Sequence, residues 1–159
     1  MIIVSDTSPI TNLLQIGDLD LLHQIFGTII IPNRVFTELC QIESQKEILT
    51  NQFWIVRATL SNPILKDELL KELDEGEAEA IALAVELKAD FLLMDEQKGR
   101  QIAESYGLKV VGILGVLIQA KQKGLISEIK PHLQRLINEA GFWLNPQLVE
   151  KILELVKEN

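Results

Sequence analysis

The sequence predicts an α/β protein in which a mainly parallel sheet is buried between helices and is followed by a C-terminal helical tail. Two observations support this fold class. Short apolar runs bounded by turn residues alternate with stretches of helical period, which is the order expected of strands joined by crossover helices. The runs "IIV", "TIII" and "FLLM" are apolar at every position, as expected of strands that helices cover on both faces.

Five short segments have strand character, because each is apolar and is flanked by residues that favour turns. They are Ile2–Val4, Thr28–Ile31, Phe53–Arg57, Phe91–Met94 and Lys109–Val111. The stretches between these strands have apolar residues at helical spacing, and glycine follows several of them where a helix ends. The predicted helices are Pro9–Ile16, Leu19–Phe26, Asn33–Ile48, Leu65–Leu73, Glu77–Lys88 and Gln97–Tyr106.

The chain after Val111 contains helical patterns only, and Asn145 is placed to cap the last of them. The predicted helices there are Ile113–Lys123, Ser127–Ala140 and Pro146–Lys157. Of the 159 residues, 47% are hydrophobic and 24% are charged, a composition typical of a folded globular domain. We therefore expect a single domain over residues 1–159, with residues 113–159 as its helical C-terminal part.

Charge, apolar run length and cysteine content exclude several classes of protein. The longest apolar run, Val110–Ile118, is about half as long as a membrane-spanning helix, so no membrane partner is expected. The apolar N-terminal stretch is too short for a signal-peptide core and Cys40 is the single cysteine, which together predict a cytoplasmic protein without an internal disulfide. The net charge of -8 argues against nucleic-acid binding through bulk positive potential, although a metal ion could neutralise phosphate charge locally.

Two aspartates directly follow predicted strands. Asp6 comes after "IIVS" and Asp95 after "FLLM", and ligands of open parallel sheets bind beyond the carboxyl ends of the strands. Helix capping is the alternative for Asp95, which precedes the helical stretch "EQKGRQIAESYGL". After the first strand, Thr7 or Ser8 can cap the next helix and Pro9 suits its first position, so capping leaves Asp6 unexplained. The two aspartates together indicate a ligand site at this edge of the sheet.

Two glutamates join these aspartates as candidate ligands. Glu38 follows Val35 by three residues, so helical spacing places it on the stripe that faces the sheet, unless it reaches water at the margin of that face. Glu77 opens the helix in "DEGEAEAIALAVEL", where the helix macrodipole alone also favours an acid. Glu79 is the rival at this place. It shares a helical row with Glu86 and is expected to be solvated, whereas the neighbours of Glu77 face inward, which favours Glu77.

The chemistry of the four candidate acids points to a divalent metal. Carboxylate oxygens without histidine or cysteine suit hard cations such as Mg²⁺ or Mn²⁺ better than zinc. Converging negative charges repel one another unless a cation lies between them. Cations of this kind bind phosphate esters and stabilise the leaving oxygen. The four acids Asp6, Glu38, Glu77 and Asp95 therefore predict hydrolysis of phosphodiester bonds at a Mg²⁺ or Mn²⁺ site.

The sequence also resembles the PIN-domain superfamily of metal-dependent nucleases. The likeness rests on a strand ending in "DTS", a proline followed by a helix with "TEL", an acid that opens an Ala/Ile-rich helix, and a strand ending in Asp. The interval from Glu77 to Asp95 matches the family's usual spacing between its third and fourth acids. The segments "LDEGEAEAIALA", "LLMDEQKGRQIA" and "VVGILGVLIQAKQKGLI" are similar to a prokaryotic branch of uncharacterised PIN-like proteins related to VapC toxins. The resemblance covers Met1 to about Val116.

This resemblance implies a three-layer α/β/α sandwich with the first and fourth strands adjacent, and a ribonuclease that depends on Mg²⁺ or Mn²⁺. Carried over by position, the family's catalytic and metal-binding acids fall on Asp6, Glu38, Glu77 and Asp95. Its hydroxyl residue falls on Thr7 or Ser8. RNA, single-stranded or structured, is the implied substrate, and the relation to toxins implies an antitoxin protein as a partner.

The sequence departs from the family pattern at two places. Many relatives have Asp where this chain has Glu77, and the longer side chain either moves the metal or favours a single ion. No further acid follows "KVVG", where some active relatives keep one, which argues against a second metal ion. Glu96, next to Asp95, is an additional candidate ligand.

Three further residues are candidates for contact with the substrate. Ser8 is placed to orient Asp6 or to contact phosphate, and Asn12 lies on the first predicted helix. Arg100 lies about one helical turn beyond Asp95, where it could clamp a phosphate, and the alternative is an exposed arginine without a role.

Alternatives to a nuclease fit the sequence to different degrees. A phosphatase of the haloacid-dehalogenase type needs a second acid two residues after its aspartate nucleophile, where this chain has Ser8, and a receiver-type domain needs an acidic pair after the first strand. The stronger rival is a catalytically weak or inactive PIN-like protein-interaction module. Its helical tail would carry an apolar stripe that either covers the core or forms a homodimer. The stripe consists of Leu148, Ile152 and Leu155 or Val156, with Trp143 before them.

Overall fold

The computed structural model describes residues 1–158 and has a five-stranded sheet at its centre. The strands are β1 (Ile3–Ser5), β2 (Ile29–Pro32), β3 (Ile55–Ala58), β4 (Phe91–Leu93) and β5 (Val110–Val111). Their order in the sheet is β3-β2-β1-β4-β5, and all four pairings are parallel. The prediction of a parallel sheet with the first and fourth strands adjacent is therefore confirmed.

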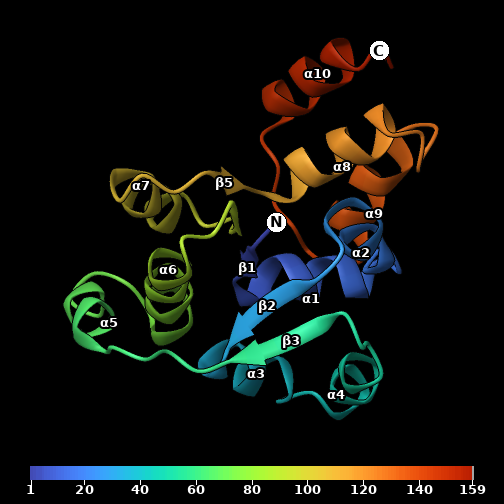
Figure 1. Cartoon of the computed structure of the whole chain (residues 1–159). Helices are drawn as coiled ribbons and strands as arrows, with labels where there is room; N and C mark the ends of the chain where they lie inside the picture. Colours follow the sequence, from blue (N-terminus) through green and yellow to red (C-terminus); the bar gives the residue numbers. More distant parts are fainter. Residues whose placement is uncertain (159) are drawn as a thin grey trace.

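Helices cover both faces of this sheet, which makes the α/β/α sandwich. Within residues 1–158 they are α1 (Thr7–Gln15), α2 (Asp20–Phe26), α3 (Asn33–Leu39), α4 (Glu43–Thr50), α5 (Ile64–Leu69), α6 (Glu75–Leu87), α7 (Gln97–Ser105), α8 (Ile113–Gln122), α9 (Lys130–Asn138) and α10 (Pro146–Leu155). Figure 1 shows α5, α6 and α7 grouped on one side of the strands and α1, α2, α8 and α9 grouped on the other. In the part of the chain that the structure describes, no helix combines the length and the apolar character needed to cross a membrane.

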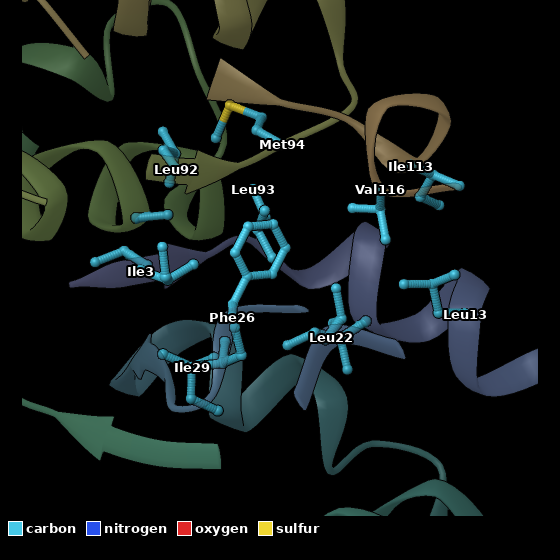
Figure 2. Packing of buried hydrophobic residues seen from close by; sticks show 14 of the residues in the cluster. Ile3, Leu13, Leu22, Phe26, Ile29, Leu92, Leu93, Met94, Ile113 and Val116 are labelled. Atoms are coloured by element: carbon cyan, nitrogen blue, oxygen red, sulfur yellow. The ribbon is translucent and has the colours of Figure 1, made fainter. Parts of the chain in front are cut away.

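The core of the protein follows from the apolar strands. Ile3 of β1 and Leu92 of β4 have no exposed surface, because their strands are central and helices lie against both faces. Figure 2 shows these side chains in the same interior as Leu22 of α2 and Val116 of α8, so segments from both halves of the chain share one core. Full burial of each such side chain contributes about 1.5 to 3 kcal/mol.

The direction in which strands are added to the sheet reverses between β1 and β4. Strands β2 and β3 follow on one side of β1, whereas β4 and β5 lie on the other. The carboxyl ends of β1 and β4 are joined by a hydrogen bond of 2.9 Å from the Asp6 amide to the Leu93 carbonyl. Asp6 and Asp95 therefore lie at the switch point, which is the position where open parallel sheets bind ligands.

Several predicted helices differ from the structure. The helices expected over Leu65–Leu73 and Ser127–Ala140 are the shorter α5 and α9. The single helix expected over Asn33–Ile48 is in fact two helices, α3 and α4, and Ile42 between them is extended with φ −102° and ψ 116°. Neither proline nor glycine marks this break, and Leu49 of α4 is buried in the structure. Helix α1 begins at Thr7, two residues before the expected start at Pro9, and this places Asp6 at the N-cap position.

The end of the described chain is fastened to the helices before it. The Glu158 carboxylate accepts hydrogen bonds from the amides of Ile129 and Lys130, at 2.8 and 3.0 Å. It also pairs with the Lys121 ammonium group of α8 at 2.8 Å. We call these four residues the C-terminal clip. The predicted cap at Asn145 is confirmed, because its side chain accepts a backbone hydrogen bond of 2.9 Å at the start of α10.

Candidate active site

A pocket of about 380 Å³ opens beside the carboxyl end of β1. Its lining residues are Asp6, Thr7, Ser8, Thr11, Asn12, Glu38, Asp74, Glu77 and Glu96. Five of these are acids, and none of the described residues that line it is a lysine or an arginine. We call it the acidic pocket. Ser8 and Asn12, predicted to contact the substrate, both lie on its wall.

Asp6 is the most buried acid of the acidic pocket, with 5% of its surface exposed. It occupies the N-cap position of α1, but its side chain accepts no capping hydrogen bond. Burial raises the pKa of Asp6 to about 7, against the lowering effect of the Thr7 amide. The negative charges of Asp74, Glu38 and Asp95 raise it further. Among the described residues, no lysine or arginine offsets the charge of Asp6.

Glu38 reaches the acidic pocket from α3, with 24% of its side chain exposed. The Thr7 hydroxyl donates a hydrogen bond of 3.1 Å to its carboxylate. A Cβ atom at Gly76 of α6 would lie 2.2 Å from Glu38 Oε1, so the glycine leaves the room that this carboxylate occupies. Burial raises the pKa of Glu38, the Thr7 hydrogen bond lowers it and the charge of Asp74 raises it again. Glu38 thus lies at the margin of the helix face and points into the pocket.

Glu77 is held at the start of α6 by a reciprocal pair of hydrogen bonds. Its amide donates to Asp74 Oδ1 at 2.8 Å, and the Asp74 amide donates to Glu77 Oε1 at 3.3 Å. Burial and the neighbouring Asp74 charge raise the pKa of Glu77 to about 7. Asp74 is a residue of the pocket that the sequence reasoning missed. The capping-box spacing Asp-x-x-Glu in "DEGE" is the signal that could have found it.

Asp95 lies in a neighbouring pocket of about 400 Å³, which it shares with Arg100. Its Oδ1 accepts a hydrogen bond of 2.8 Å from the Ile113 amide at the start of α8. Its Oδ2 is buried and has no hydrogen-bond partner among the described residues. Burial raises the pKa of Asp95, whereas the Ile113 amide and the Arg100 charge lower it. One of the two oxygens of the Asp95 carboxylate therefore has a hydrogen-bond partner, and the other has none among the described residues.

Helix capping does not account for Asp95, because Glu96 performs it. The Glu96 side chain accepts a hydrogen bond of 2.8 Å from the Gly99 amide in the first turn of α7. Glu96 also lines the acidic pocket, where it was expected as an additional ligand, but this cap already occupies one of its oxygens. A Cβ atom at Gly112 would lie 2.7 Å from Arg100 Nη1 and 2.9 Å from Asp95 Oδ1, so this glycine lets both groups approach the start of α8.

The expectation that Glu79 is solvated is wrong. Glu79 is buried and pairs with Lys66 of α5 at 2.6 Å. Its other oxygen accepts a hydrogen bond of 3.0 Å from the Arg34 amide. Burial alone would raise the pKa of Glu79, but the bonds from Lys66 and the Arg34 amide hold it below its usual value. Glu79 is thus a structural carboxylate with its own cation, which leaves Glu77 as the acid of α6 that faces the pocket.

The donor set of this site fits a hard divalent cation. The structure brings Asp6, Glu38 and Glu77 to one pocket without a compensating lysine or arginine in its wall, and Asp95 keeps one buried oxygen unpaired beside it. All of these donors are carboxylates, the ligands that Mg²⁺ and Mn²⁺ prefer. As the side chains lie, residues 1–158 contain no three Asp, Glu, His or Cys residues already grouped to hold a metal ion. The fourth acid, Asp95, is turned toward α8.

Comparisons with known proteins agree with this architecture. The family model described as "DUF3368: PIN domain" matches residues 2–158. Among solved structures, a PilT N-terminus domain protein from the hyperthermophilic archaeon Sulfolobus solfataricus P2 superimposes with a TM-score of 0.58. That match has 18% sequence identity and covers 76% of this chain and 93% of the archaeal chain, so it supports the fold alone. No curated protein matches the chain.

Proposed function

The chain belongs to the PIN-domain family, and from this membership we propose that it is a nuclease that uses Mg²⁺ or Mn²⁺ to hydrolyse phosphodiester bonds of RNA. The observation that carries the proposal is the acidic pocket. Asp6, Glu38 and Glu77 come from three separate segments and meet at the switch point of the sheet, although no lysine or arginine lines the pocket among the described residues. Carboxylates gathered in this way are destabilising unless a cation joins them.

We assign the metal ion to the four acids that the sequence singled out: Asp6, Glu38, Glu77 and Asp95. When bound, the ion supplies Lewis-acid stabilisation of the charge that develops on the phosphate during hydrolysis. The free Oδ2 atom of Asp95 supports its inclusion, since a buried carboxylate oxygen without a partner is costly. Thr7 orients Glu38 through its hydrogen bond, and Gly76 leaves space for that orientation.

The remaining groups of the pocket have roles that follow from their chemistry. Glu77, held at the pocket wall by its hydrogen bonds with Asp74, either completes the ligand shell of the ion or positions the attacking water as a general base. Ser8 and Asn12 offer a hydroxyl and an amide to phosphate oxygens from the pocket wall. Arg100 clamps a phosphate from the neighbouring pocket, where its guanidinium lies beside Asp95.

The central experiment combines metal titration with RNA cleavage. Titration calorimetry with Mn²⁺ is expected to detect one binding event, and single-stranded and structured RNA are both offered as substrates. Asp6→Asn and Asp95→Asn are each expected to lower the cleavage rate by roughly 10²- to 10⁴-fold. The matched control is Asp67→Asn, which changes an exposed aspartate of α5. Cleavage that persists in both site variants or needs no metal contradicts the proposal.

For the biological role, we propose the toxin of a toxin–antitoxin pair that acts on RNA in the cytoplasm, with an antitoxin protein as its partner. The support is the likeness of its motifs to VapC-related proteins. Expression of the wild-type chain is expected to arrest growth, and expression of Asp6→Asn is not. A small protein encoded beside the gene is expected to relieve the arrest and to co-purify with the chain. Growth that is equally slow with both versions contradicts the toxin role.

The alternative function is a catalytically inactive interaction module that pairs with a second copy through its C-terminal part. The observation that favours it is the exposure of two large apolar side chains, Trp143 at 80% and Leu155 at 71%. The buried member of the predicted stripe is Ile152, at 7%. A homodimer that dissociates in Trp143→Ser, together with no metal binding and no cleavage by the wild type, would favour the module over the nuclease.

A further inference from the structure

This inference rests on the proposed nuclease function, which requires the acidic pocket to receive a negatively charged strand. A phosphodiester strand is negative, and the acids of the pocket repel it. Two arginines lie beside the site. Arg100 on α7 lines the neighbouring pocket together with Asp95, and Arg34 on α3 lies next to Glu38. Figure 1 shows α6 between α3 and α7, so the two arginines approach the site from different sides.

The guanidinium group of Arg34 is near two carboxylates but is not committed to either. Its Nε atom lies 3.8 Å from Glu38 Oε1 and 3.6 Å from Glu75 Oε2. Both distances exceed the 2.7 to 2.9 Å typical of charge-assisted hydrogen bonds. The Nε atom is buried and has no hydrogen-bond partner among the described residues. A buried donor without an acceptor is costly, so the present contacts of Nε do not hold the guanidinium in place, and the exposed part of the side chain remains open to a ligand.

The closed ion pairs of the same protein show what a structural pair looks like here. Lys66 and Glu79 are 2.6 Å apart, and Lys121 and Glu158 are 2.8 Å apart. In both pairs the carboxylate also accepts backbone hydrogen bonds. By this measure, the contacts of Arg34 with Glu38 and Glu75 are loose.

The backbone of Arg34 is fixed although its side chain is not. Its amide donates a hydrogen bond of 3.0 Å to Glu79 Oε1, and Glu79 is itself held by Lys66. Arg34 is the second residue of α3, and 41% of its side chain is exposed. A rigid backbone and an accessible, uncommitted guanidinium are the properties of an arginine that receives an anionic ligand.

We propose that Arg34 is a phosphate-binding residue of this site, which takes a phosphodiester oxygen of the nucleic-acid strand on the α3 side of the acidic pocket. Glu38 couples this arginine to the metal site. A divalent cation held by Glu38 competes with Arg34 for the charge of that carboxylate, so the guanidinium is released for phosphate when the ion is present. In the absence of the ion, Arg34 is the counter-ion that Glu38 has within 4 Å among the described residues.

Arg135 offers a matched control. Its Nε atom lies 3.8 Å from Glu139 in the same i,i+4 arrangement, and its side chain is also 41% exposed, but it is on α9. The probe is a fluorescently labelled phosphorothioate RNA oligonucleotide, and its Kd is measured at several salt concentrations with and without Mn²⁺. Arg34→Gln is expected to weaken binding about tenfold in Mn²⁺ and to reduce the salt slope by about one. Arg135→Gln is expected to change neither quantity.

The conservative variant separates phosphate binding from a structural role. Arg34→Lys keeps the charge and the salt slope but loses the planar fork, so it is expected to weaken binding about threefold. In cleavage assays Arg34→Lys raises KM and leaves kcat unchanged. An affinity of Arg34→Gln equal to that of the wild type overturns the inference, as does an equal loss in Arg34→Gln and Arg135→Gln. Failure of the wild type to bind RNA at all is a different result, because it overturns the proposed function and this inference with it.

Discussion

Carboxylates buried or half buried in two kinds of place behave in opposite ways in this molecule. Glu79 and Glu158 each meet a lysine within 3 Å and backbone amides, and these partners hold their pKa values below the usual range although burial opposes this. Asp6 and Glu77 meet no lysine or arginine within residues 1–158, and burial raises their pKa values to about 7. The protein can satisfy a buried acid with its own cations. The acidic pocket is therefore a place where a cation from solution is expected.

Asp6→Asn is expected to have the largest effect on stability. The folded pKa of Asp6 lies above its unfolded value of 3.8. The contribution of Asp6 to the free energy of unfolding is therefore most favourable below pH 3.8, and it is lost as the pH rises toward 7. At pH 7.5 without divalent ions, the variant should gain roughly 2 to 4 kcal/mol in its free energy of unfolding. Urea titration measures this gain, and Asp67→Asn serves as the exposed control. A loss of stability in Asp6→Asn would mean that the charge is compensated after all.

Lys66→Ala should act in the opposite direction. It leaves Glu79 buried without its cation, and the expected loss is about 2 to 3 kcal/mol at neutral pH. The control is Lys71→Ala, because Lys71 pairs with Glu68 at 2.9 Å on the open surface, where such a pair contributes less than about 1 kcal/mol. Equal losses in the two variants would remove the distinction between buried and exposed pairs.

Glu158→Gln tests the C-terminal clip. Replacing the carboxylate weakens charge-assisted bonds to Lys121 and to the start of α9, with an expected loss of about 1 to 2 kcal/mol at pH 7. Because the folded pKa of Glu158 is lowered from 4.5, this contribution is present above pH 4.5 and is lost as the pH falls through the folded value. Unfolding curves of wild type and variant should therefore converge in acid. A constant difference at all pH values would contradict an electrostatic clip.

Gly76→Ala should have the smallest effect on stability and a selective effect on activity. The added Cβ atom meets the end of the flexible Glu38 side chain, which can move aside at little cost in folding energy. The displaced carboxylate should lower cleavage about threefold to tenfold, as expected for a misplaced catalytic group. Gly115→Ala, in α8 and away from the pocket, is the control. Unchanged cleavage in Gly76→Ala would argue that the position of Glu38 is unimportant.

Much of the fold and of the candidate site could be predicted from local sequence patterns. The continuously apolar strands and the aspartates that follow β1 and β4 could be predicted, because strand burial and the strand ends are local properties. The burial of Glu79 could not be predicted, because it depends on an ion pair with Lys66, which belongs to another helix. The orientation of Asp95 depends on the Ile113 amide 18 residues away. The split between α3 and α4 could not be predicted either, because no proline or glycine marks it in the local sequence.

The most direct test is the effect of Mn²⁺ on the free energy of unfolding at pH 7.5, measured for wild type and Asp6→Asn. An ion that binds the folded acidic pocket at about one hundred times its Kd should stabilise the wild type by about 2.7 kcal/mol. The shift should be largely lost in Asp6→Asn, and it should be smaller at pH 5, where protons compete for the carboxylates. No shift in the wild type, or the same shift in both proteins, would contradict a metal site at this edge of the sheet.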